Sequence, residues 1–183
     1  MKKRIGLVIA LIICFCMIGC TSDEQNQTEI SKEEKQEILT DFLVEFFNFN
    51  CNGRYDTLMQ SMENDDSLVD VNTSEEGIAP ITQVQEQALE TYYAYLMPYV
   101  TEACLDTMQA NRLPVQLDKF TKEKGIEASV DYIELTEYDE NTYSYRVHFE
   151  ETGEAYFTDG LAGQVSYEIV GDEVKVSAIS IVQ

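Results

Sequence analysis

The sequence contains no tryptophan, one histidine, three prolines and few basic side chains among its 183 residues. One histidine and five cysteines offer no four-ligand spacing of a structural zinc site. The chain also lacks a GxSxG elbow, a phosphate-binding loop, a dinucleotide fingerprint and a Cys–His pair arranged for nucleophilic catalysis. These absences leave no recognisable catalytic motif. We therefore expect a protein that is not an enzyme and has neither metal nor cofactor.

The scarcity of basic residues gives the chain a strong negative charge. Lysine and arginine number 12 against 34 aspartates and glutamates, for a formal net charge of −22. Nucleic acid is excluded as a partner, because binding it requires cationic groups that displace phosphate counterions. Two interpretations stay open. The charge attracts a cationic partner, or it keeps the protein soluble and away from a negative membrane and wall.

Residues 1–19 predict a secretory signal peptide. Three basic residues precede an apolar run from Ile5 to Ile18, and Gly19 and Cys20 follow. A charged start, an apolar core and a small residue before the cleavage point are typical of such signals. As a helix the run would extend about 21 Å, which is shorter than a bilayer's hydrocarbon core of about 30 Å. A permanent membrane span is therefore not expected.

The residues Met17-Ile18-Gly19-Cys20 resemble the lipobox of bacterial lipoproteins, with a departure at Met17, where leucine is commonest. The resemblance implies cleavage before Cys20 and a diacylglyceryl thioether on that cysteine. Its acyl chains would anchor the protein in the cell membrane, on the outside of the cytoplasmic membrane. Residues 20–30 would be the lipidated cysteine and a flexible polar tether. The alternative is an ordinary cleaved signal with a coincidental cysteine.

Cys51 and Cys104 are the cysteines left for the folded part of the chain. Outside the cytoplasm they could form a disulfide, which would constrain the unfolded chain. The alternative is two buried thiols that behave as small hydrophobic side chains.

Residues 31–183 predict one domain that begins with helices. Ser31 and Glu34 have the spacing of a capping box, and apolar residues at helical spacing follow. We therefore expect a first helix over 32–50 and a short second helix over 54–62.

The middle of the chain predicts an exposed acidic loop over 63–80 and a long helical stretch over 81–111. Pro98 lies inside that stretch. Because proline lacks a backbone donor and crowds the preceding turn, we expect a kink or a break there. A further helical turn is expected within 117–124.

After residue 127 the apolar period changes to two, which predicts antiparallel strands. We expect them over 130–138, 143–150, 161–169 and 174–181. In the last strand the apolar phase slips between Val176 and Ile179, which predicts a β-bulge near 177–178.

The order of helices, a bent long helix and curved strands resembles the nuclear transport factor two-like superfamily, an α+β cone also called cystatin-like. The resemblance rests on the segments YSYRVHFEE, GLAGQVSYEIVGDEVKVSAISIV and QALETYYAYLMPYVTEACLDTMQANR. The resemblance covers 32–183 and departs at 62–81, where family members often have shorter connections. It implies N-terminal helices packed on a curved antiparallel sheet, with a pocket at the open end of the cone.

By this resemblance, the pocket walls would come from Phe46, Tyr92, Tyr95, Tyr99, Tyr145, Val147 and Tyr167. A row of tyrosines could offer hydroxyl groups to a ligand. The alternative is a filled core whose tyrosine hydroxyls find partners at its edge.

Enzymes of this superfamily often use an Asp with a His or Tyr inside the cone. His148 lies in phase with polar residues, so we expect it on the outer face of the sheet with a cross-strand carboxylate partner. The favoured function is therefore a non-catalytic module that binds a small apolar ligand, a peptide or a protein and could dimerise through its sheet. A hydrolase or isomerase with a buried carboxylate beside a tyrosine, or an accessory part of a secretion or conjugation assembly, is the alternative.

Overall fold

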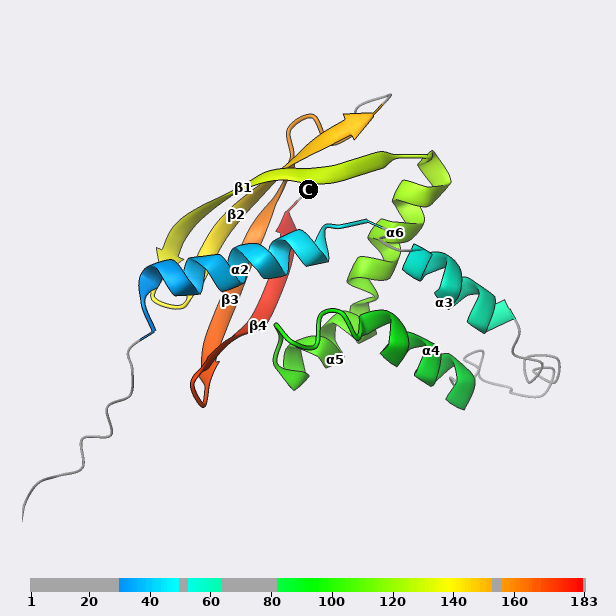
Figure 1. Cartoon of the computed structure of the whole chain (residues 1–183), viewed down its shortest axis with the longest axis horizontal. Coiled ribbons are helices and arrows are strands. Elements are labelled where there is room, and N and C mark those ends of the chain that lie inside the picture. The colour runs from blue at the N-terminus through cyan, green and yellow to red at the C-terminus, as the bar shows by residue number, and fades with distance from the viewer. Residues whose placement is uncertain (1–29, 50–52, 64–81, 153–155, 183) are drawn as a thin grey trace, which may run out of the picture. The chain divides into compact units, whose positions relative to one another are not determined.

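The computed structural model describes residues 30–49, 53–63, 82–152 and 156–182. Residues 31–183 form a compact unit separate from residues 1–30. The described helices of this unit are α2 (Lys32–Phe46), α3 (Arg54–Glu63), α4 (Gln83–Tyr93), α5 (Glu102–Asn111) and α6 (Leu113–Lys124). Its described strands are β1 (Glu127–Asp139), β2 (Thr142–Thr152), β3 (Leu161–Val170) and β4 (Glu173–Val182) (Figure 1). The mixed α+β class is confirmed, and among the described helices none is long and apolar enough to span a bilayer.

The four strands form one antiparallel sheet in the order β1-β2-β3-β4. Ser166 of β3 pairs with Ala178 of β4, whereas the next residue, Tyr167, pairs with Val176. Ser177 is therefore an extra residue, and the predicted bulge is confirmed. An extra residue on one strand bends it and increases its twist.

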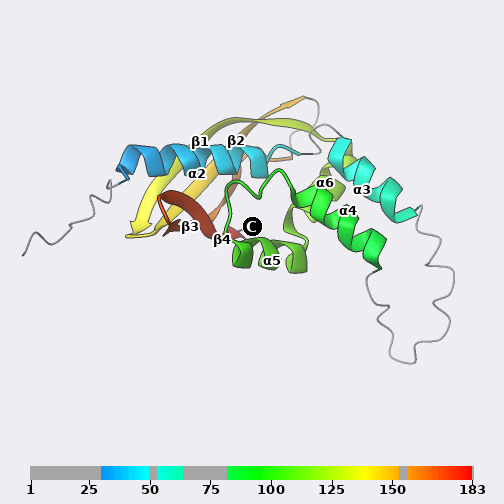
Figure 2. The ribbon, with the colours of Figure 1, turned by 60° about the horizontal axis from the view of Figure 1, so that its bottom comes forward.

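Helix α2 lies along one face of the sheet, and Figures 1 and 2 show it beside the strands in both views. One half of the predicted capping box is present, because the Ser31 hydroxyl accepts a hydrogen bond from the Glu34 amide at 3.1 Å. The buried stripe of α2 includes Leu39 and Phe42, and the Phe47 ring that follows packs on Tyr145 of β2. The helix ends at Phe46, four positions before the predicted end.

The expected long helix is broken, as Pro98 predicts. Helix α4 ends at Tyr93, turns fill 94–99, and the Thr101 hydroxyl caps α5. Within the break the chain reaches the edge of β4, where the Val176 amide donates to the Tyr99 carbonyl at 2.8 Å and the Thr101 amide donates to the Val176 carbonyl at 2.9 Å. The break thus attaches the helical layer to the sheet beside the bulge.

Helix α6 is longer than the expected single turn. It starts just after Arg112, a residue in the left-handed conformation at φ 51°. Pro114 occupies its first turn, where a missing backbone donor costs nothing. The buried face of α6 consists of Pro114, Asp118 and Thr121. Because two of these three are polar, apolar periodicity did not reveal the helix.

Candidate functional site

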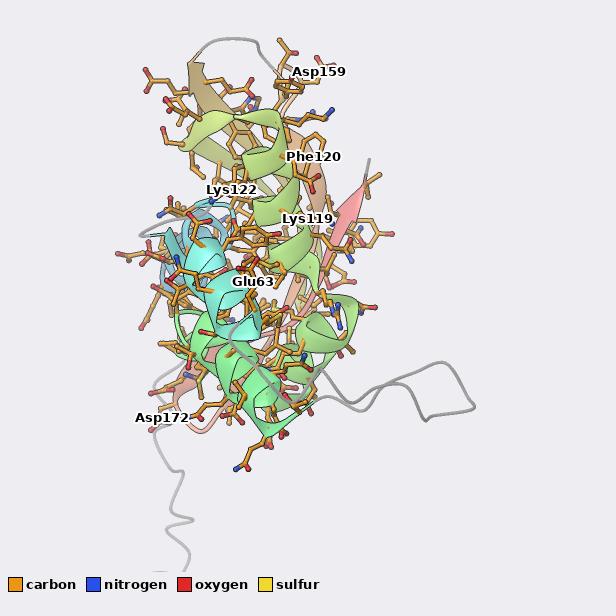
Figure 3. The ribbon with its side chains drawn as sticks, turned by 90° about the vertical axis from the view of Figure 1, so that its right-hand side faces the viewer. Glu63, Lys119, Phe120, Lys122, Asp159 and Asp172 are labelled. Carbon is orange, nitrogen blue, oxygen red and sulfur yellow. The ribbon has the colours of Figure 1, made fainter. Side chains whose placement is uncertain are left out.

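Helices α3 and α4 pack side by side and leave a surface hollow of about 470 Å³, here called the α3–α4 hollow. In Figure 3, which faces this side of the unit, Glu63 marks the end of α3, and Lys119 and Lys122 mark the neighbouring helix α6. The hollow is lined by Arg54, Thr57, Leu58 and Ser61 of α3 and by Val84, Gln87, Ala88, Thr91 and Tyr92 of α4.

Behind the hollow lies a buried polar cluster built from three helices. Asp118 of α6 is completely buried. Its carboxylate accepts hydrogen bonds from Arg54 Nε at 2.9 Å, from Arg54 Nη2 at 3.4 Å and from the Tyr92 hydroxyl at 2.5 Å. Arg54 Nη2 also donates to the Asn48 carbonyl at 2.7 Å. The planar guanidinium therefore joins α3 to α6 and also to the residues that directly follow α2.

Aromatic rings surround the arginine. The Arg54 guanidinium carbon lies 4.1 Å from the centre of the Tyr95 ring and 5.8 Å from that of Tyr92. Such cation–π contacts are strongest where water is excluded. The Tyr95 hydroxyl oxygen is buried and has no hydrogen-bond partner among the described residues. Tyr95 therefore contributes its ring, rather than its hydroxyl, to the cluster.

The protonation states of the cluster follow from these contacts. Burial opposes the charge on Arg54, but the hydrogen bond from its guanidinium to Asp118 and the neighbouring tyrosines outweigh burial, so the pKa of Arg54 is raised. Burial, then Tyr95 and the Asp118 carboxylate, raise the pKa of Tyr92 far above its ordinary value. Tyr92 is therefore a neutral donor at physiological pH. The wall formed by Arg54 and Tyr92 carries a charge that Asp118 balances.

The other described residues of the lining are uncharged. The hydroxyls of Thr57, Ser61 and Thr91 donate to the carbonyls four residues earlier in the chain, at 3.2, 2.9 and 2.9 Å. Their oxygens can still accept hydrogen bonds. Leu58, Val84 and Ala88 supply apolar surface between them. This surface suits an uncharged ligand with an apolar body and a hydrogen-bond donor.

The residues expected to form one pocket are mostly core residues. Five of them, Phe46, Tyr92, Tyr145, Val147 and Tyr167, are at most 4% exposed, while Tyr95 and Tyr99 are half-buried. Of the seven, Tyr92 alone lines the α3–α4 hollow. The hydroxyls of Tyr145 and Tyr167 donate to the carbonyls of Ser180 and Glu140, at 2.8 and 3.1 Å. These backbone partners are what the filled-core alternative predicts, although Tyr145 also lines a separate surface hollow.

Arg54 and Asp118 were missed by sequence reasoning. Their side chains meet across 64 positions of sequence, and charged residues are exposed by default. With 34 acidic residues available, no single carboxylate could be nominated. A weak signal did exist, since Asp118 shares a helical stripe with Pro114 and Thr121.

His148 lies on the sheet as predicted, with a carboxylate across the strand. Its ring stacks on Tyr132 of β1 at 4.1 Å between centres, and its Nε2 atom is 3.5 Å from Glu134 Oε1. The Nε2 atom is buried and makes no hydrogen bond with a described residue. His148 therefore lies against the sheet near a carboxylate and takes no part in the α3–α4 hollow.

The cysteines contribute nothing to this site. Cys104 is a free, buried thiol, and burial raises its pKa to about 11. Cys51, the other cysteine of the pair considered for a disulfide, lies outside the described residues, and so does Cys20. Within the described ranges, no group of three His, Cys, Asp or Glu side chains could hold a metal ion.

No protein-family model matches the chain, and neither does any curated protein or any solved structure. A function must therefore be inferred from the sequence and from the geometry described above.

Proposed function

We propose that this chain is a lipoprotein anchored to the outside of the cytoplasmic membrane and that its folded unit is a non-catalytic binding module. The anchor rests on the basic, apolar and small residues that precede Cys20. Mass spectrometry of the membrane-bound protein should find an N-terminal cysteine with a diacylglyceryl group. A Cys20→Ala variant should leave the membrane fraction. An unmodified, uncleaved start would contradict the anchor.

The finer fold assignment, a cone of the nuclear transport factor two-like superfamily, is part of the same proposal. Three features support it: helices precede an antiparallel meander, α2 covers one face of the sheet, and the bulge at Ser177 bends β4. An experimental structure with a flat sheet, or with β4 detached from the break at Pro98, would argue against it.

The α3–α4 hollow is the proposed binding site, and its ligand is a small uncharged organic molecule. One observation carries this choice: among the described residues that line the hollow, Arg54 alone is charged, and the buried Asp118 neutralises it. A charged ligand would therefore gain little electrostatic binding energy from the Arg54 side of the hollow. The volume of about 470 Å³ falls within the roughly 300–1,000 Å³ typical of small-molecule sites.

A neutral fluorescent probe, N-phenyl-1-naphthylamine, tests this site. Its fluorescence should rise on titration into the soluble unit Ser31–Gln183. Ala88→Phe should fill the hollow and lower the affinity at least about tenfold, since Ala88 is a lining residue. The matched control is Ala110→Phe, an exposed residue of α5 outside the lining. Equal binding by both variants would contradict the proposal, provided that both unfold like the parent.

A hydrolase or isomerase is the second candidate. It is favoured by the 2.5 Å contact between Asp118 and Tyr92, because the tyrosine also lines the hollow. It ranks second for two reasons: the carboxylate is already paired with Arg54, and Tyr92 is a poor base when neutral. A turnover that Tyr92→Phe abolishes, with probe binding retained, would favour the enzyme.

A further inference from the structure

A second hollow lies between α5, the end of α4 and the turns that join them. It measures about 600 Å³ and shares no lining residue with the α3–α4 hollow. We call it the acidic groove. Six of its lining residues carry the argument: Glu90, Met97, Val100, Glu102, Leu105 and Asp106.

The floor of the acidic groove is apolar. Leu105 is half-buried and Val100 is 7% exposed, while Met97 at the side is 56% exposed. Val100 is attached to the sheet, because it forms a parallel bridge with Val176 of β4. An exposed methionine beside such a floor adapts to different apolar partners.

Among the described residues, the rim of the acidic groove carries three carboxylates and no lysine or arginine. Glu90, Glu102 and Asp106 enter no ion pair with another described residue, and no lysine or arginine is among the lining residues. Lys175 reaches the neighbouring turn, but it is engaged by the Pro98 carbonyl at 2.7 Å and by a glutamate of its own strand. Glu102 lies in the first turn of α5, where the helix dipole stabilises its negative charge. Neither Glu90 nor Asp106 has this stabilisation, because neither lies in the first turn of its helix.

The spacing of these groups identifies the partner. Glu102 and Asp106 are four residues apart, so they are about 6 Å apart along α5, with Leu105 between them in sequence. A second helix with lysine or arginine at the same spacing and apolar residues beside them would match both the charges and the floor. We infer that the acidic groove binds a cationic amphipathic helix of another protein. This inference is independent of the ligand proposed for the α3–α4 hollow.

The test titrates the unit Ser31–Gln183 with a synthetic helical peptide of leucine and lysine, about four turns long, with its lysines on one face. Calorimetry should give a dissociation constant that Glu102→Gln/Asp106→Asn raises about fivefold or more. Met97→Gln should also raise it, because the apolar contact is lost. The matched control is Glu33→Gln/Glu37→Gln, an exposed pair in α2 with the same spacing and the same charge change.

The controls separate a defined groove from general attraction to an acidic protein. A peptide of the same composition, scrambled so that it has no apolar face, should bind more weakly and should not distinguish the two double variants. An equal loss of affinity in the α2 control, or unchanged binding by Met97→Gln, would overturn the inference. Circular dichroism should show a similarly small loss of stability, about 0.3–1 kcal/mol, in both double variants, because each removes one exposed glutamate from the first turn of a helix.

Discussion

The substitution Arg54→Met removes the cation from a carboxylate that has no access to water. The Asp118 side chain is 1% exposed and the Arg54 side chain 13% exposed. Breaking one side of a buried ion pair typically costs about 3–5 kcal/mol. We expect about 3 kcal/mol for Arg54→Met, at the low end because the Tyr92 hydroxyl continues to donate to the carboxylate. For a unit of this size, the melting temperature should fall by about 6–12 °C.

Replacing both partners should cost much less than the two single losses together. Asp118→Leu leaves the Arg54 cation and the Tyr92 hydroxyl unpaired, so it should also cost about 3 kcal/mol. In Arg54→Met/Asp118→Leu no charge remains, and the main penalty is the hydroxyl of Tyr92, about 1–2 kcal/mol. The double-mutant cycle should therefore give a coupling energy of about 4 kcal/mol.

Urea unfolding of the unit Ser31–Gln183, followed by circular dichroism at pH 7, measures each free energy of unfolding. The reference cycle uses the exposed pair Lys119–Glu123 of α6, whose charged atoms are 3.7 Å apart. That pair should couple by less than about 0.5 kcal/mol. If the Arg54–Asp118 cycle gives no larger coupling than this reference, the buried cluster does not exist as described.

Three further outcomes follow from single sites. Gly163→Ala should lose about 3 kcal/mol of stability in urea, because its Cβ would lie 1.9 Å from the Ser180 carbonyl oxygen. Gly171→Ala, with no atom within 4 Å, should lose only about 1 kcal/mol, from its positive φ; equal losses would refute the crowding. Thr82→Ala should cost about 1 kcal/mol by removing the capping box of α4, and no loss in urea would refute the cap. Burial raises the pKa of Cys104 to about 11 from 9.0, so the folded state keeps this proton while the unfolded chain loses it. Stability should therefore fall as pH rises from 9 to 11, and Cys104→Ala should show a smaller fall.

The strands could be predicted from the sequence because apolar residues at every second position show which side chains face the core and where the pairing shifts. The apolar phase shifts between Val176 and Ile179, and the structure shows Ser177 as the extra residue. Pro98 could also be interpreted directly, since its chemistry does not depend on distant partners. Helix α6 could not be predicted in full, because its buried face depends on Asp118 finding Arg54 in another helix.

The candidate site was largely hidden for the same reason. The tyrosines were recognised as apolar-face residues, yet Tyr92 and Tyr145 serve different purposes. The Tyr145 side chain passes over Gly163, and its hydroxyl donates to the Ser180 carbonyl of β4. The Tyr92 hydroxyl donates to the Asp118 carboxylate of the buried ion pair. Helical spacing placed Tyr92 on a buried stripe but could not reveal which polar groups from other helices would meet it there.

The position of the α3–α4 hollow within the unit leads to one more prediction, which rests on the proposed anchor. Helix α2 has 15 residues and is therefore about 22 Å long. Its start is paired through Lys32 with Glu137, near the β1–β2 turn, whereas α3 and α4 lie beyond its other end (Figure 1). Shortening the chain between Cys20 and Ser31 should therefore crowd the β1–β2 turn against the membrane before it crowds the hollow.

Deleting residues 22–29 from the anchored protein in neutral lipid vesicles tests this geometry. A cysteine introduced by Asn141→Cys in the β1–β2 turn should react more slowly with a bulky polyethylene-glycol maleimide after the deletion. A cysteine introduced by Ser61→Cys at the hollow should react at an unchanged rate, because α2 separates it from the tethered end. From both rates, the rate at which the native cysteines of the unsubstituted chain react with the maleimide is subtracted. Equal slowing at the two positions would mean that α2 does not hold the hollow away from the bilayer.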